Sequence, residues 1–414
     1  MLPHARRVCA LVTILTGAFV AALTLSTTTS RNHAPMLGGY RLDVFFDSAA
    51  SAAALGAIVA VLVSVKSRNN RTAFIASGIG IAVLAVATLV HSPVQLHLRG
   101  LAAGLILGGS AALAVGPARR LLQCALVVGV MSAFVMLGPL EHVPYRYRDY
   151  MASSPRTYLL VLLGVLALLL VASVWASVFD NASEPARGSA RALVVGAAVP
   201  VAGLVLYWLF VRSVSSLGSN GAMGSRWLLG LAVVPLLVGA AFALRAATGA
   251  VVLAALAYAA VVSTGSVSSA SSGTVAAVVF SAMLVAGTVI GCRWPVPLVG
   301  FALLAVVAAA GLFTNGIEST AHLLLLPFAV GLVFASLLPT DVPAATISVT
   351  TPIVVSVPIV AQFGWTAYTP LTTVEPTRWP SGWEWTSTAT AILSVAAAAG
   401  ALVLLRRRDA GLRQ

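Results

Sequence analysis

The chain has 414 residues, of which 59% are apolar and only 8% are charged, and its mean hydropathy is +1.00. A water-soluble protein of this length needs far more charge to cover its surface. The composition therefore excludes a soluble globular protein and predicts an all-α, polytopic membrane protein. The net charge of +13 does not indicate a nucleic-acid partner, because the basic residues stand singly between apolar runs, where they suit anionic lipid headgroups.

Apolar runs follow one another along the whole chain. Each crossing of a membrane takes about 20 residues at ~1.5 Å rise per residue. The sequence therefore predicts about 14 transmembrane helices joined by short loops, with no folded soluble domain. The runs lie at 8–28, 47–65, 73–90, 99–116, 121–140, 157–178, 192–211, 227–244, 248–263, 274–291, 295–313, 321–338, 343–362 and 387–405.

The basic residues predict which connections face the cytoplasm. Arg6 and Arg7 precede the first run as in a signal peptide, but no small-residue cleavage site follows, so we expect a retained first helix. With a cytoplasmic N-terminus, 15 of the Lys and Arg residues fall inside and 9 outside. This bias predicts a multi-pass protein of the plasma (inner) membrane with both termini cytoplasmic. The inside set is Arg6, Arg7, Lys66, Arg68, Arg71, Arg119, Arg120, Arg187, Arg191, Arg245, Arg293, Arg406, Arg407, Arg408 and Arg413.

The polar segment 179–191 divides the chain near its middle and is predicted to be a cytoplasmic linker. We expect a six-helix bundle over 1–178, two intervening helices over 192–245 and a second six-helix bundle over 246–414.

One stretch resembles a known family. Pro117-Ala-Arg119-Arg120 leads directly into a run that ends Leu137-Gly138-Pro139-Leu140. In residues and spacing this is similar to the start and end of helix five in the 14-helix drug/proton antiporter branch of the major facilitator superfamily. Gly138 permits close approach of a neighbouring helix, and Pro139 removes a backbone donor and kinks its own. The resemblance implies a two-bundle secondary transporter.

Further segments are similar to the same family. The basic turn with Lys66, Arg68 and Arg71 resembles the family's basic loop between helices two and three, and Arg99 resembles the arginine that opens helix four. The departures are specific. Ser26 stands where the family has an aspartate in the first helix, and Glu141 and His142 replace two glycines after Gly138-Pro139. The chain is thus either a divergent transporter or a transporter-like protein that does not transport.

Ionisable residues inside a membrane usually mark function. None of the 11 acids falls at the centre of a predicted span. The resemblance implies a part in proton coupling for Arg99; the alternative is an arginine that reaches the outer headgroups. The acids and histidines at the outer helix ends are either coupling or substrate residues, or capping and solvated side chains. These candidates are Asp43, Asp47, Glu141, His142, Glu318 and His322.

The leading prediction is a proton-coupled exporter of a hydrophobic or amphipathic compound, working by alternating access and not by enzyme chemistry. One alternative is a non-transporting membrane subunit that scaffolds an envelope or efflux complex with a protein partner. Another is a glycosyltransferase acting on lipid-linked sugars through Asp43 and Asp47. No phosphate-binding loop or metal-ligand spacing is present, so we expect no cofactor and no metal. Cys9, Cys124 and Cys292 are interpreted as small core residues.

Overall fold

In the computed structural model, all regular secondary structure among the described residues is helical. The described residues cover 3–30, 49–67, 69–89, 94–116, 118–140, 156–176, 178–179, 190–215, 231–244, 246–262, 264, 273–313, 316–364 and 382–411. The helices are α1 Pro3–Ser30, α3 Ala49–Lys66, α4 Asn70–Leu89, α5 Gln95–Leu113, α6 Arg119–Leu140, α7 Arg156–Trp175, α8 Ala190–Ser215, α10 Val233–Ala243, α11 Ala246–Val262, α12 Gly273–Arg293, α13 Pro297–Ala310, α14 Ile317–Thr320, the π-helical turn η3 Ala321–Leu325, α15 Leu326–Leu337, α16 Val342–Gly364 and α17 Gly382–Gly411.

The all-α class predicted from composition is confirmed, and each predicted apolar run coincides with a helix. Eight of the described helices, counting α14, η3 and α15 as one, are long and apolar enough to cross a membrane by length and composition. Others are shorter: α10 has 11 residues and α13 has 14, so α10 rises only ~16 Å against a hydrocarbon core of ~30 Å. The helical fold fits lipid, because a helix satisfies its backbone hydrogen bonds internally.

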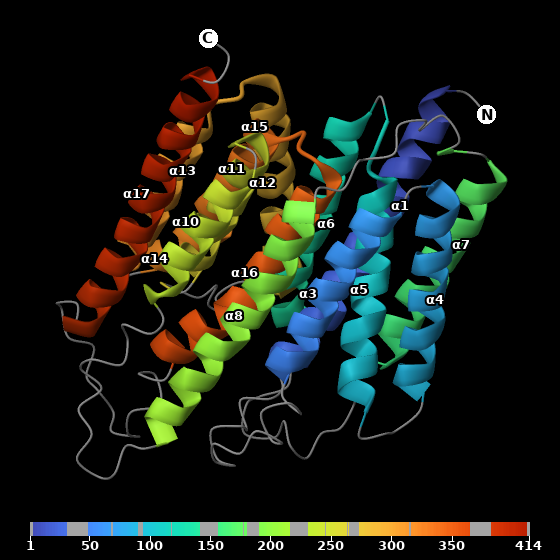
Figure 1. Cartoon of the computed structure of the whole chain (residues 1–414), viewed down its shortest axis with the longest axis horizontal. Helices are drawn as coiled ribbons and strands as arrows, with labels where there is room; N and C mark the ends of the chain where they lie inside the picture. Colours follow the sequence, from blue (N-terminus) through green and yellow to red (C-terminus); the bar gives the residue numbers. More distant parts are fainter. Residues whose placement is uncertain are drawn as a thin grey trace.

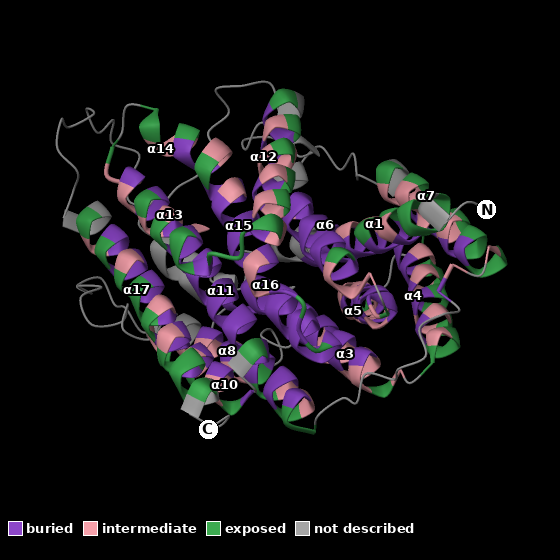
Figure 2. Cartoon of the chain, turned by 90° about the horizontal axis from the view of Figure 1, so that it is seen from above, coloured by how far each residue is buried: buried purple, intermediate pink, exposed green. Residues whose placement is uncertain are grey.

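The outer surface of the helix assembly is apolar. On α7, Leu168, Val171 and Trp175 are all exposed, and α4, α12 and α17 expose further large apolar side chains. Figure 2 shows buried residues concentrated in α3, α6, α11, α15 and α16, with exposed faces on α4, α7, α13 and α17 around them. A surface of this kind is stable against acyl chains and not against water. The chain is therefore a membrane-embedded helical protein.

Among the described helices, the first six and the last six pack in the same pattern. In the first bundle (α1, α3, α4, α5, α6 and α7), α1 packs on α6, α3 on α5 and α4 on α5. In the second bundle (α11, α12, α13, α14–η3–α15, α16 and α17), α11 packs on α16, α12 on α15 and α13 on α15. Between the bundles, α6 meets α12 while α16 meets α3. Each bundle therefore faces the other with equivalent helices (Figure 1).

Glycines allow the tightest crossing in each bundle. A Cβ atom on Gly56 of α3 would lie 2.7 Å from the carbonyl oxygen of Gly100 on α5. In the second bundle, a Cβ on Gly291 of α12 would lie 2.6 Å from the carbonyl oxygen of Leu332 on α15. Only glycine permits backbones to approach so closely, which is how helices associate without a hydrophobic driving force in lipid.

The two intervening helices take different places. α8 lies against both α3 and α16, so it contacts the two bundles at once, whereas α10 packs mainly on α11 and touches α17. Gly196 of α8 sits against Val61 of α3, and Gly203 sits near Val354 of α16. α8 therefore covers the contact between α3 and α16.

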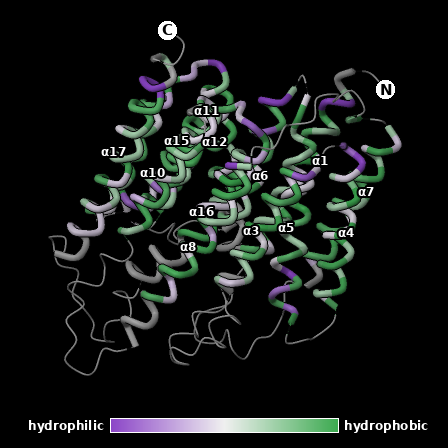
Figure 3. Tube along the Cα trace, in the orientation of Figure 1, coloured by the Kyte–Doolittle hydropathy of each residue, from purple (hydrophilic) through white to green (hydrophobic). Residues whose placement is uncertain are grey.

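The beginning of α1 and the end of α17 lie at the same end of the molecule (Figure 1). Hydrophilic residues gather at this end of the helices (Figure 3). We call this end the arginine-rich end. Its described basic residues are Arg6, Arg7, Lys66, Arg71, Arg119, Arg120, Arg191, Arg293 and Arg406 to Arg408.

Candidate gate between the two helix bundles

The first turns of α6 carry polar residues at helical spacing. Arg119 and Gln123 are four residues apart, as are Arg120 and Cys124, so each pair shares a strip of the helix surface. α6 packs against α12 and α15 of the other bundle. The arginine pair of the Pro117–Arg120 motif therefore begins a helix that faces the second bundle.

Gln123 and Arg119 hold the turn between α15 and α16. The Gln123 amide donates to the backbone oxygen of Thr340 at 2.8 Å, and its carbonyl oxygen accepts from the Thr340 N–H at 2.9 Å. Arg119 also donates to the Thr340 oxygen, and its guanidinium lies 3.4 Å from a carboxylate oxygen of Asp341. Gln123 is fully buried. Side chains of the first bundle therefore supply the hydrogen bonds that the backbone of this turn needs. Without them, these buried backbone groups would be unpaired.

Arg120 joins two helix ends of the second bundle. Its guanidinium donates to the carbonyl oxygen of Gly291 at 3.2 Å and to that of Ala335 at 3.0 Å. These oxygens lie in the last turns of α12 and α15, where carbonyls have no partner within the helix. A cation is also favoured at this end of a helix by the helix dipole. One side chain thus fastens α6 to both α12 and α15.

The same strip brings two thiols together. The Sγ atoms of Cys124 on α6 and Cys292 on α12 are 3.6 Å apart, although 168 residues separate them in the chain. Both cysteines are free. The expectation that the cysteines are only small core residues is incomplete, because the approach of α6 to α12 makes these two neighbours. Cys9 lies elsewhere, 3.6 Å from the hydroxyl of Ser173 on α7.

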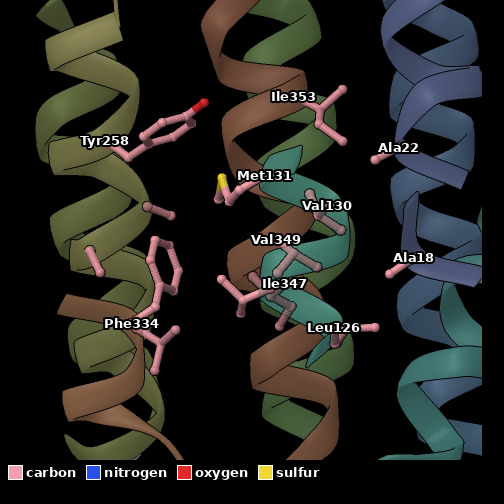
Figure 4. Packing of buried hydrophobic residues seen from close by; sticks show 14 of the residues in the cluster. Ala18, Ala22, Leu126, Val130, Met131, Tyr258, Phe334, Ile347, Val349 and Ile353 are labelled. Carbon is pink, nitrogen blue, oxygen red and sulfur yellow. The ribbon is translucent and has the colours of Figure 1, made fainter. Parts of the chain in front are cut away.

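We call Arg119, Arg120, Gln123 and their partners the gate contacts. They lie at the arginine-rich end and connect α6 to α12, α15 and the turn before α16. The middle of the interface between the bundles is apolar. Met131 of α6, Tyr258 of α11, and Ile347 and Ile353 of α16 are buried there (Figure 4), and the rings of Phe134 and Tyr258 are 6.4 Å apart.

Buried hydroxyls on α16 do not change the apolar character of this centre. Thr346, Ser348, Thr350 and Thr351 are all buried, and each donates to a backbone oxygen three or four residues earlier in its own helix. Among the acids, Glu318 and Asp341 are those whose side chains the structure describes, and both lie at helix ends. In the described part of the chain, the centre of the interface is therefore uncharged.

His322 is the most unusual of the candidates named from the sequence. It is 2% exposed and lies in η3, and π-helical turns of this kind are frequent at functional sites. Its Nδ1 is 3.0 Å from the backbone oxygen of Glu318, which can only accept, so Nδ1 carries the hydrogen in the neutral ring. Nε2 is then the acceptor, and it has no hydrogen-bond partner among the described residues.

The other candidates are dispersed. Arg99 is half-buried near the start of α5, two residues after His97, whose Nε2 lies 3.2 Å from the Ser51 hydroxyl of α3. Arg99 and His322 thus belong to different bundles, and both lie toward the end opposite the gate contacts. Glu318 is half-buried, while Lys66 and Arg71 are exposed at the arginine-rich end. Outside the described residues or side chains lie Asp43, Asp47, Arg68, Gly138, Pro139, Glu141 and His142.

Sequence reasoning identified the arginine pair but missed most of its partners. Gln123, Thr340 and Asp341 carry no motif, and their contacts span more than 200 residues. The available signal was the spacing of four residues from Arg119 to Gln123 and from Arg120 to Cys124, which puts polar groups on a helix face inside an otherwise apolar run.

No family model matches the sequence, and no curated protein matches it significantly.

Proposed function

We propose that this protein is a secondary transporter of the major facilitator type that exports a hydrophobic or amphipathic compound by alternating access. In this proposal the helices make 14 crossings of the plasma membrane, and the arginine-rich end faces the cytoplasm. The repeated six-helix packing and the placement of both chain ends at the basic end support it. The resemblance of the Pro117–Leu140 stretch to the antiporter family adds to this support.

The gate contacts are the observation that carries the proposal. Three side chains of α6 bind backbone groups of the opposite bundle at the arginine-rich end of the interface. Hydrogen bonds to backbone oxygens can be replaced by water when the end opens, so their net cost of breaking is about 0.5–1.5 kcal/mol each, or more for the charged donors. Such contacts suit a closed gate that opens again.

The chemistry of the interface indicates the class of cargo. Apolar side chains fill its middle, and the described hydroxyls of Thr346, Ser348, Thr350 and Thr351 on α16 are already bonded to their own helix. A phosphorylated or multiply charged cargo would find no counter-charge there, and burying it unpaired would be costly. A hydrophobic or amphipathic compound is therefore the cargo that this surface accepts.

His322 is the proposed site for the coupling proton. Its Nε2 is buried without a hydrogen-bond partner among the described residues, and the half-buried Glu318 precedes it by one helical turn. Arg99 occupies a comparable place in the first bundle, near the start of the equivalent helix α5. A proton at His322 would bias the equilibrium between the two arrangements of the bundles.

Flux in reconstituted liposomes tests the proposal. With an acidic interior, vesicles carrying the protein should accumulate ethidium or a fluorescent short-chain phospholipid faster than protein-free vesicles, and an ionophore that collapses the pH gradient should abolish the difference. Arg120→Gln should reduce this flux because it removes a gate contact, whereas Arg407→Gln at an exposed position should not. Absence of gradient-dependent movement of every probe would overturn the proposal.

The coupling role of His322 has its own test. His322→Gln should lose accumulation driven by the pH gradient yet keep exchange of labelled for unlabelled probe across vesicles without a gradient. His97→Gln is the matched control, because His97 is half-buried and lies beside the Ser51 hydroxyl. Retained gradient-driven accumulation in His322→Gln would assign the proton to another group.

A non-transporting subunit is the second candidate. It is favoured by the placement of both described acids, Glu318 and Asp341, at helix ends and not within a span. Purification from native membranes in mild detergent separates the two functions. A stoichiometric membrane protein that co-purifies, together with no flux in liposomes, would support a scaffold.

A further inference from the structure

A pair of cysteines lies between the bundles, next to the gate contacts but not part of them. Cys124 lies in the first bundle and Cys292 in the second, with their Sγ atoms 3.6 Å apart. A disulfide needs the sulfurs at about 2.05 Å, so a shift of roughly 1.5 Å, within the range of side-chain rotation, would join them. We propose that peroxide oxidation links Cys124 to Cys292 and fastens the two bundles together at the arginine-rich end.

The surroundings of the two thiols differ in a way that orders the reaction. Cys124 is 3% exposed, whereas Cys292 is only half-buried, in the last turn of α12. The Arg120 guanidinium binds the carbonyl oxygen of Gly291, the residue before Cys292, and so places a positive charge beside this thiol. Reactive cysteines occur in partly exposed, electropositive surroundings of this kind. Cys292 therefore reacts first and Cys124 resolves it.

The chemistry balances with hydrogen peroxide as the oxidant. The Cys292 sulfur attacks one peroxide oxygen, the O–O bond breaks, and the products are the sulfenic acid of Cys292 and one water. The Cys124 sulfur then attacks the sulfenic sulfur, the S–O bond breaks, and the hydroxyl leaves as a second water after taking the Cys124 proton. Two thiols are oxidised by two electrons in total, and one peroxide is reduced. Thiol–disulfide exchange with a cytoplasmic thiol reverses the link.

A covalent link here would hold the gate closed. The disulfide joins α6 to α12, beside the hydrogen bonds of Arg120 to Gly291 and Ala335. Opening of the arginine-rich end separates these helices, so a linked protein cannot complete a transport cycle. This consequence rests on the proposed function, whereas formation of the disulfide does not. In a reducing cytoplasm disulfides are typically transient and redox-sensing, which fits a reversible stop under peroxide stress.

The test uses the full chain with a protease recognition sequence inserted in the connection between α7 and α8, reconstituted in liposomes. The protein is treated with peroxide, cleaved by the protease and separated by electrophoresis without reductant. The gel shows whether the two halves of the cleaved chain stay joined. After peroxide, the unaltered protein and Cys9→Ser should migrate at full length, and dithiothreitol should release two fragments. Cys124→Ser and Cys292→Ser should give two fragments throughout.

The outcomes separate the inference from the proposed function. Halves that part after peroxide in the unaltered protein overturn the inference, whatever the flux. If the link forms but probe flux in Cys9→Ser continues undiminished, the conclusion that the disulfide holds the gate closed is overturned. The expected result is a link together with loss of flux to the protein-free level, restored by dithiothreitol, with Cys292→Ser insensitive to peroxide. A link in a protein that shows no flux in either redox state supports the disulfide and contradicts the transporter.

Discussion

Two equivalent contacts join the bundles, and they are built from different chemistry. At α6–α12, Arg120 and Gln123 extend polar side chains into the opposite bundle. At the equivalent contact, α16–α3, Val354 packs with Ala54 and Ala57, and Leu204 of α8 lies against them. The same pattern of helices therefore carries a hydrogen-bonded contact on one side and an apolar contact on the other.

The difference indicates how the two contacts respond to movement. Small apolar side chains can slide over one another with little loss, since dispersion contacts are individually weak and are replaced as they are lost. Hydrogen bonds to defined backbone oxygens are either made or broken. We therefore expect the α6 contact to act as a two-state gate and the α16–α3 contact, covered by α8, to act as the pivot.

The largest effect is expected at the crossings within the bundles, which should be equally sensitive if the two are equivalent. Gly56→Val and Gly287→Val each place a side chain against the backbone of the parallel helix. Each should destabilise the fold by about 3 kcal/mol, the upper part of the range for overpacking. Thermal unfolding in detergent, followed by tryptophan fluorescence, measures the loss.

Gly78→Val on α4 is the matched control, because nothing lies within 4 Å of a Cβ at that position. Its midpoint of unfolding should stay close to that of the unaltered protein. A large loss at Gly56 with none at Gly287 would break the equivalence of the two bundles.

A smaller effect is expected at the gate. Gln123→Leu removes both hydrogen bonds to Thr340 and leaves a buried N–H unpaired, at a cost of about 1–3 kcal/mol, or a factor of about 5–150 in the closed-to-open ratio. In a Cys9→Ser, Cys292→Ser background, the rate at which N-ethylmaleimide labels the buried Cys124 reports the opening and should rise accordingly.

Val354→Ala tests the other contact in the same background. It removes apolar atoms between α16 and α3 and should leave the labelling rate of Cys124 unchanged, because the gate contacts remain. Equal acceleration by Gln123→Leu and Val354→Ala would remove the distinction between gate and pivot.

The smallest effect is expected for Asp341→Asn. Its ion pair with Arg119 is long, at 3.4 Å, and the two side chains are 52% and 35% exposed. Such pairs contribute roughly 0–1 kcal/mol and are screened by salt. Labelling of Cys124 should rise less than in Gln123→Leu, and the increase should fade between low and high ionic strength. A change as large as that of Gln123→Leu would place the energy of the gate in the ion pair.

Much of the local structure followed from the order of residues. A run such as 121–140 has to form a helix in lipid, because an unpaired backbone group there costs several kcal/mol. Arg119 and Arg120 were identified because the Pro117–Arg120 turn resembles a family motif, and such a motif is likewise a pattern of neighbouring residues. The partners of Arg120 could not be identified this way, because the carbonyls of Gly291 and Ala335 have no side-chain signature.

By itself the sequence determined that the surrounding medium is lipid, that the fold is all-α and where the helices lie. Apolar content and residue spacing act within a single segment, so they can be read without the rest of the fold. Tertiary structure alone decided which helices meet. It set Cys124 against Cys292, gave α8 its place on both bundles and left His322 buried beside Glu318. The physical reason is that packing between helices in lipid depends on close fit of small side chains and backbone, and uniformly apolar sequences do not encode that fit in any local pattern.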